Sequence, residues 1–254
     1  MIIDIHAHVH ADAVNRDIEE QSLLDDMDRN GIDLRVISAL DTWDASEGNK
    51  FVSNLVSRMP GRLLGCAVAN PKDPDCASKI AQDLCLPGMA MLEMNSFEHG
   101  YYPDVCPGVE RVLDVAEKMG IPVKVFTGIG CRSMPQQWMK HVRNHPSIPF
   151  IFLHMGCFDY GYGCVDLVNG AENLYIETSN QYEVQILKKA YRSAPHDRVL
   201  FGSMWPDRLT RCSLDVFDTL SPDDSFLQML HGENAAKLLG IGTVEPHCSS
   251  PANR

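Results

Sequence analysis

Basic side chains are scarce in this chain relative to acidic ones. Its 254 residues include 22 Lys and Arg against 34 Asp and Glu, which gives a formal net charge of -12. Proteins that bind nucleic acid use positive side chains to neutralise phosphates. The charge balance therefore argues against a nucleic-acid partner.

Long hydrophobic runs are also missing. The longest apolar runs, such as the one from Ile148 to Met155, are the length of a strand and fall short of the roughly 20 residues that cross a bilayer. The first residues are apolar and lack the basic stretch and long apolar core of a secretory signal. We therefore expect no membrane partner and a cytoplasmic location.

Paired cysteines and phosphate-binding loops are absent as well. The nine cysteines are an odd number without a CxxC pair, and a chain of this length does not need disulfides for stability. We expect reduced thiols. Neither a GxGxxG after a strand nor the Lys-Ser/Thr ending of a phosphate-binding loop occurs, which disfavours a doubly wound dinucleotide-binding sheet.

Short apolar runs alternate with segments of helical period, at roughly 24 to 33 residues per unit. Eight such units predict an α/β fold, a single-domain (β/α)8 TIM barrel over residues 1–242, followed by a C-terminal tail at 243–254. The predicted strands are Ile2–Ile5, Leu34–Ser38, Leu63–Val68, Met89–Met94, Pro122–Phe126, Phe150–His154, Leu174–Glu177 and Val199–Gly202.

Two histidines close the first predicted strand, in Asp4-Ile5-His6-Ala7-His8. Because alternate side chains of a strand share a face, we expect Asp4, His6 and His8 inside the barrel and the apolar residues between them outside. Two imidazoles so placed can bind one cation, with Asp4 orienting a ring. The alternative is a pair of surface or hydrogen-bonded histidines.

Several segments together resemble the amidohydrolase superfamily, in the branch of aminocarboxymuconate-semialdehyde-type decarboxylases and related metal-dependent hydrolases. The resemblance covers nearly the whole chain and rests on IIDIHAH, GIPVKVFTG, FIFLHMG, NLYIETS, RVLFGSMWP and HGENAAKLLG. It implies a (β/α)8 barrel with a site for one or two metal ions, often zinc, that activates water or polarises the substrate.

Position by position, the resemblance assigns His6 and His8 as metal ligands and His154 as a residue that binds metal or acts on the substrate. Glu93 matches a fourth-strand carboxylate ligand of some members; the alternative is a carboxylate paired inside the barrel. Two positions depart from the family. Phe126 replaces a fifth-strand histidine, and Met204 replaces an eighth-strand aspartate that serves as ligand and base.

Lys124 shares the strand parity of Phe126, so we expect it inside the barrel, paired with Glu93 or Asp4. Our hypothesis is that its charge favours a metal-free site. Alternatively, loop residues replace the missing ligands, the candidates being His10, His99, Cys131, Cys157, Asp159 and Asp207. Arg132 and Arg208 are weaker candidates for holding a substrate carboxylate.

Three functions follow from these residues. The first is a hydrolase acting on a small carboxylate, amide or ester, with a divalent metal, zinc being expected, and with His154 as acid or base. The second is a metal-dependent decarboxylase. The third is a metal-free, catalytically lapsed barrel with a binding role. We expect a small-molecule substrate; a homodimer is common among such barrels, and the sequence leaves the oligomeric state and the substrate open.

Overall fold

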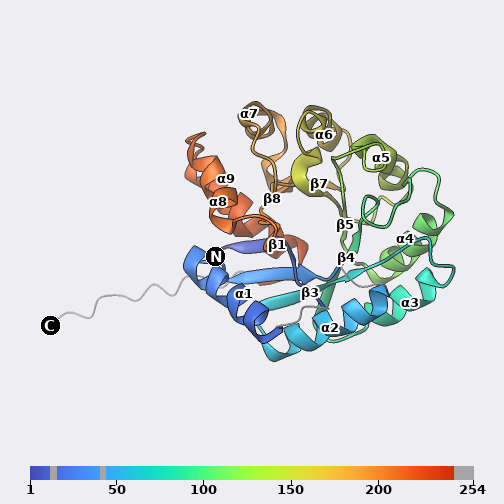
Figure 1. Ribbon diagram of the computed structural model, residues 1–254. Coiled ribbons are helices and arrows are strands. Elements are labelled where there is room, and N and C mark those ends of the chain that lie inside the picture. The colour runs from blue at the N-terminus through green and yellow to red at the C-terminus, as the bar shows by residue number, and fades with distance from the viewer. Residues whose placement is uncertain (12–15, 41–43, 243–254) are drawn as a thin grey trace.

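In the computed structural model the chain forms a single barrel, described over residues 1–11, 16–40 and 44–242. Eight parallel strands follow one another around it in chain order, and helices surround them (Figure 1). The strands are β1 (Ile3–His8), β2 (Leu34–Ser38), β3 (Leu63–Val68), β4 (Met89–Met94), β5 (Val123–Val125), β6 (Phe150–Phe152), β7 (Leu174–Glu177) and β8 (Val199–Leu200). The predicted (β/α)8 fold is confirmed.

The helices of the outer layer lie between consecutive strands, and three short ones follow the last strand. They are α1 (Arg16–Asn30), α2 (Ala45–Arg58), α3 (Cys76–Asp83), α4 (Pro107–Met119), α5 (Pro135–Asn144), α6 (Tyr160–Asn169), α7 (Val184–Ser193), α8 (Thr210–Asp218), α9 (Asp224–Gln228) and α10 (Asn234–Leu238). None of the helices described is long and apolar enough to cross a membrane. The predicted tail, 243–254, lies outside the described residues.

Helix α4 illustrates how the sequence determines these elements. Pro107 starts it at a position where no backbone N–H is needed, and Gly120 ends it in the left-handed region at φ 67°. Its apolar residues recur at helical spacing, and those on one face, Val109, Val112, Leu113 and Ala116, are buried against the barrel. This face holds the helix against the sheet.

The seam between β8 and β1 closes the barrel. The N–H of Ile5 donates to the carbonyl of Phe201 at 3.1 Å, and the N–H of His8 donates to that of Trp205 at 2.7 Å. These bonds continue beyond the two residues of β8, so that the segment after the strand completes the pairing. The first and last strands of the barrel thus meet beside the two predicted ligand histidines.

The expected alternation of β1 is wrong in its first half. Between β1 and β2, Asp4 pairs with Arg35 and Ala7 with Ile37, so β1 contains one extra residue. This bulge reverses the strand's parity. Ile3 and Ile5 pack inside the lower barrel, in a cluster with residues of β2, β3, β4, β6 and β8 that α10 closes, and Asp4 faces outward.

Candidate metal and acid–base site

The three predicted metal ligands come together at the upper end of the barrel interior. Nε2 of His6 lies 3.3 Å from Nε2 of His8, and Nε2 of His8 lies 3.4 Å from Oε1 of Glu93. All three side chains are buried. The bulge in β1 makes this arrangement, because it turns both His6 and His8 toward β4.

Lys124 and Ser38 hold the other oxygen of Glu93. Nζ of Lys124 lies 3.1 Å from Oε2, and Oγ of Ser38 donates to the same oxygen at 2.7 Å. Burial alone raises the pKa of Glu93, but the positive charge of Lys124 and the contact with His8 outweigh it and hold the pKa well below 4.5. Of the two predicted partners of Lys124, the structure therefore shows Glu93 and not Asp4.

Asp4 contacts a different set of groups, on the outer side of the strand. Its carboxylate accepts hydrogen bonds from the backbone N–H of His6 at 3.1 Å and of Ser203 at 3.0 Å. Its other oxygen lies 2.8 Å from Nε of Arg35, which also contacts Asp26 in α1. The sequence suggested that Asp4 orients an imidazole ring, and this expectation is wrong. Asp4 instead holds the backbone of β1 against the segment after β8.

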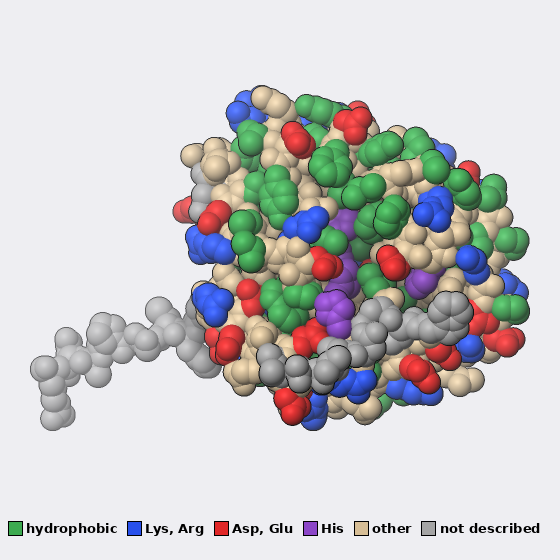
Figure 2. All heavy atoms as spheres, in the orientation of Figure 1, with side chains coloured by type: hydrophobic (Ala, Val, Ile, Leu, Met, Phe, Trp, Pro, Cys, Tyr) green, Lys and Arg blue, Asp and Glu red, His purple; other side chains and the backbone are tan. Residues whose placement is uncertain are grey.

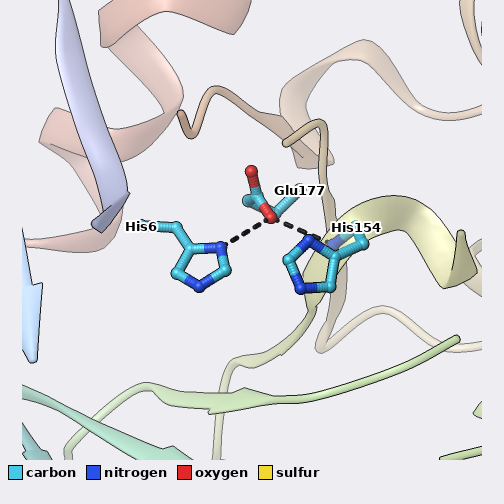
Figure 3. A group of neighbouring side chains, drawn as sticks. All are labelled: His6, His154 and Glu177. Carbon is cyan, nitrogen blue, oxygen red and sulfur yellow. Dashed lines mark hydrogen bonds and ion pairs between the residues drawn. The ribbon is translucent and has the colours of Figure 1, made fainter. Parts of the chain in front are cut away.

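Glu177, at the end of β7, joins two of the histidines (Figure 3). Its Oε2 lies 3.2 Å from Nδ1 of His6 and accepts the backbone N–H of His154 at 3.0 Å. Oγ of Ser179 donates to the same oxygen at 2.8 Å. Because a carboxylate only accepts, Nδ1 of His6 carries the proton, and its Nε2 lone pair points toward His8.

His154 lies in a short turn, Leu153–Gly156, that follows β6, rather than on the strand itself. Its backbone is left-handed, at φ 60°, which turns the side chain toward the barrel axis. Nδ1 lies 3.2 Å from the carbonyl oxygen of Ser179 and must donate to it. Among the described residues, nothing hydrogen-bonds to the buried Nε2 atom.

The imidazoles of His6 and His154 are neutral in this environment. Burial lowers the pKa of His154 to about 3, and the proximity of the His6 ring lowers it further. Burial also lowers the pKa of His6 well below 6.5, together with the charge of Lys124 and the proximity of His8. Neutral imidazoles offer a nitrogen lone pair, which is the form that binds a metal or accepts a proton.

An apolar wall stands at Phe126, where the resemblance to the family led us to expect a fifth-strand histidine. The ring of Phe126 meets the ring of His154 edge-on, with centroids 5.2 Å apart, and stacks against Phe97 at 5.6 Å. The guanidinium of Arg132 lies over the ring of Phe97, 5.7 Å from its centroid. On the face that Figure 2 shows, histidine side chains lie in the centre and hydrophobic side chains border them.

The other candidate ligands from the loops are placed differently. Asp207 comes near the cluster, with Oδ2 4.0 Å from Nδ1 of His8. Cys157 is buried and accepts a hydrogen bond from Asn180, and Cys131 contacts the hydroxyl of Tyr102 at 3.5 Å. His10 contacts Glu19 at 2.9 Å. Of these four residues, Asp207 is the one with an ion pair to a predicted ligand.

The donor set fits a divalent cation. His6, His8 and Glu93 each offer one ligand atom, and these atoms lie within 4.8 Å of one another. Oε1 of Glu93 is buried without a hydrogen bond among the described residues. Each remaining polar atom of His6 and Glu93 is held by a neighbour. Imidazole and carboxylate together suit zinc and similar ions.

Sequence reasoning missed Glu177, Ser179 and Ser38. The signal for Glu177 was present, because it is a charged residue at the end of an otherwise apolar strand, where a barrel places its active site. Ser38 is the last residue of β2 and Ser179 follows β7 by two residues, but a lone serine at such a place carries no pattern of its own.

A sequence comparison identifies the family of the chain. The family profile described as amidohydrolase matches residues 3–241. No curated protein sequence matches the chain.

Solved structures share the fold over nearly the whole chain. The 5-carboxyvanillate decarboxylase of Sphingomonas paucimobilis has a TM-score of 0.71 and 17% identity, covering 95% of this chain and 99% of that one. A probable 2-pyrone-4,6-dicarboxylic acid hydrolase of Acinetobacter baumannii has a TM-score of 0.74 and 17% identity. The match covers 94% of this chain and 99% of that one. The dihydroxybenzoic acid decarboxylase of Polaromonas sp. JS666, solved with bound manganese, has a TM-score of 0.71 and 18% identity. The match covers 94% of this chain and 97% of that one.

Proposed function

The chain belongs to the amidohydrolase family, and from this premise we propose that it is a metal-dependent hydrolase acting on a small carboxylate, amide or ester. The observation that carries the proposal is the convergence of Nε2 of His6, Nε2 of His8 and Oε1 of Glu93, beside a His154 nitrogen that has no hydrogen-bond partner among the described residues.

In this proposal His6, His8 and Glu93 hold a divalent cation, zinc being our first choice. A solved relative of the same fold contains manganese, which makes that ion the second choice. When bound, such a cation supplies Lewis acidity, which makes water more acidic and a carbonyl carbon more electrophilic. Glu177 holds the proton on Nδ1 of His6 and so keeps the Nε2 lone pair available.

His154 is the group that moves a proton. Its Nδ1–H donates to the carbonyl of Ser179, which fixes the ring, and its Nε2 lone pair can accept a proton from attacking water. Since the imidazole begins neutral, it acts first as a base and then, once protonated, as an acid toward the leaving group. Phe126 excludes water from one side of this ring.

A decarboxylase is the second candidate. It is favoured because the buried carboxylates of the site already have hydrogen-bond or ion-pair partners and are not free to act as a base. Both oxygens of Glu177 accept hydrogen bonds, Oε2 of Glu93 is held by Lys124, and Met204 replaces the aspartate of relatives. Among the buried groups of the site described above, His154 remains to take a proton from water. Loss of carbon dioxide does not require such a base: the bond between the carboxylate and the substrate carbon breaks, its electron pair stays on that carbon, and the carbon takes a proton from the solvent.

The test compares the two reactions in one preparation. The full chain, loaded with Zn²⁺ or Mn²⁺, is incubated with small esters, amides and aromatic or aliphatic carboxylates. Hydrolysis is followed by mass spectrometry of the acid and amine or alcohol, and decarboxylation by release of carbon dioxide. We expect hydrolysis that disappears in H8A and in H154A. Carbon dioxide release without hydrolysis would select the second candidate, and no metal-dependent product would reject both.

The remaining expectations are also proposals. The substrate is a small molecule, the location is cytoplasmic, and a second copy of the chain is a candidate partner. Size-exclusion chromatography with light scattering would measure the oligomeric state directly.

A further inference from the structure

Lys124 is the one positive side chain among the groups described at the centre of the barrel. It comes from the middle of β5, is fully buried, and pairs in register with Glu93 of β4. Its ammonium contacts Oε2 of Glu93 at 3.1 Å and donates to the carbonyl of Ile5 at 3.2 Å. These contacts connect β5 to β4 on one side and to β1 on the other.

We propose that Lys124 is an internal cation that shares the Glu93 carboxylate with the bound metal, so that it positions Glu93 for ligation and at the same time weakens metal binding. This inference rests on the proposed metal site. It makes Lys124 a positioning residue, because its ammonium touches a ligand and not the substrate.

The carboxylate of Glu93 is divided between two environments. Oε2 receives Lys124 and the hydroxyl of Ser38. Oε1 has no hydrogen bond among the described residues and faces Nε2 of His8. The pair of donors thus prevents both oxygens from turning toward the imidazoles, and Glu93 offers a single oxygen to a cation.

The charge of Lys124 acts against a second cation on the same carboxylate. Like charges that share one buried group repel each other strongly, because the protein interior screens them less than water does. Without Lys124, Glu93 would present its full negative charge to the metal. Removal of the ammonium should therefore tighten metal binding, even though Glu93 loses one of its anchors.

A purely structural ion pair makes a different prediction. If Lys124 served only to neutralise Glu93 in the fold, its replacement would lower stability and leave metal affinity unchanged or reduced. If it positions Glu93 and opposes the metal, affinity rises when the charge is removed. Metal affinity therefore distinguishes the two roles, whereas stability does not.

The experiment measures the dissociation constants of Zn²⁺ and Mn²⁺ for the full chain, by competition with a chromophoric chelator after the protein has been stripped of metal. The variants are K124M and, as a matched control, K79M, which removes an exposed lysine paired with Asp73. We expect K124M to bind both ions at least tenfold more tightly than the wild type, and K79M to be unchanged. Equal or weaker binding by K124M overturns the proposal.

K124M leaves the buried Glu93 without its counter-ion and could therefore fail to fold. A second pair of variants covers this case. E93Q removes the carboxylate charge, and K124M/E93Q removes both charges. The double variant should bind metal more tightly than E93Q, since the repulsion is removed in this background as well. Equal or weaker binding by the double variant again overturns the proposal.

Failure of the proposed metal site is separately visible through H8A. If H8A binds metal as the wild type does, the site assignment fails. If H8A loses binding and K124M matches the wild type, only the inference on Lys124 fails. If the wild type binds neither ion and K124M binds one, the inference is supported in its extreme form. If neither protein binds, both proposals are rejected.

Discussion

Oδ2 of Asp4 lies 2.8 Å from Nε of Arg35, on the outer side of β1 and away from the histidines that follow it in sequence. Both side chains are fully buried. The same carboxylate accepts the backbone N–H groups of His6 and Ser203. Asp4 thus connects the bulge of β1 to the segment after β8 and to the helix layer.

Replacement of Asp4 should therefore destabilise the whole barrel. Because D4A leaves the Arg35 charge buried without this partner, we expect a loss of about 3–5 kcal/mol in the free energy of unfolding. Urea denaturation followed by circular dichroism measures it. The control is D28A, which breaks the exposed pair with Arg62 and should cost at most about 1 kcal/mol. Similar losses in the two variants would contradict this role of Asp4.

Replacement of Glu177 should affect the site more than the fold. E177Q removes the negative charge that holds the proton on Nδ1 of His6, and the loss of such a partner typically lowers metal affinity or activity by about 10- to 100-fold. Chelator competition measures the affinity. E172Q, an exposed glutamate beside β7, is the control and should behave as the wild type. Unchanged affinity in E177Q would remove Glu177 from the site.

Gly202 should tolerate no side chain, because it lies directly against the carboxylate of Glu177. A Cβ at this position would overlap Oε1 of Glu177 and approach the Cβ of His6 at 2.9 Å. We expect G202A to displace Glu177 and to reduce metal affinity by about tenfold or more. The control is G242A, where a Cβ meets open space. Wild-type affinity in a folded G202A protein would show that Glu177 can move without consequence.

A separate cluster between α4 and α5 should make stability depend on pH. His145 contacts Glu110 and Glu117 at 2.9 Å each. Burial lowers the pKa of His145, but the hydrogen bonds to Glu110 and Glu117 outweigh it and leave the pKa above 6.5. Burial raises the pKa of Glu110, but its hydrogen bond to His145 and the charge of His141 leave it below 4.5. For Glu117, hydrogen bonds to Ser147 and His145 lower the pKa.

The signs of these shifts define the pH window. Stability from His145 is complete below about pH 6.5 and is lost as the pH rises through its raised pKa, whereas stability from the two glutamates is complete above about pH 4.5 and is lost as the pH falls through their lowered values. H145Q should therefore lower the melting temperature more at pH 5.5 than at pH 8.5. K140Q, an exposed change on α5, serves as the control. An equal loss at both pH values would contradict the assignment.

Much of the barrel could be predicted from hydrophobic periodicity, because each strand is a short apolar run buried on both faces. Strand parity also placed Lys124 inside the barrel, with Glu93 and Asp4 as alternative partners, of which the structure shows Glu93. The orientation of Asp4 and Ile5 did not, since a one-residue bulge leaves no mark in the local pattern. The bulge depends on how β1 pairs with β2 and β8, which are distant in sequence. Glu177 and the turn that carries His154 likewise depend on contacts between different strands.

The bond between Asp4 and Ser203 has a consequence for the order in which the protein assembles. The two residues are 199 positions apart, so a chain emerging from the ribosome contains His6 and His8 long before it contains the segment that fixes them. Contacts of such long range form late, after the local βα units. The proposed metal ligands of β1 can therefore reach their final arrangement only after Ser203 has been synthesised.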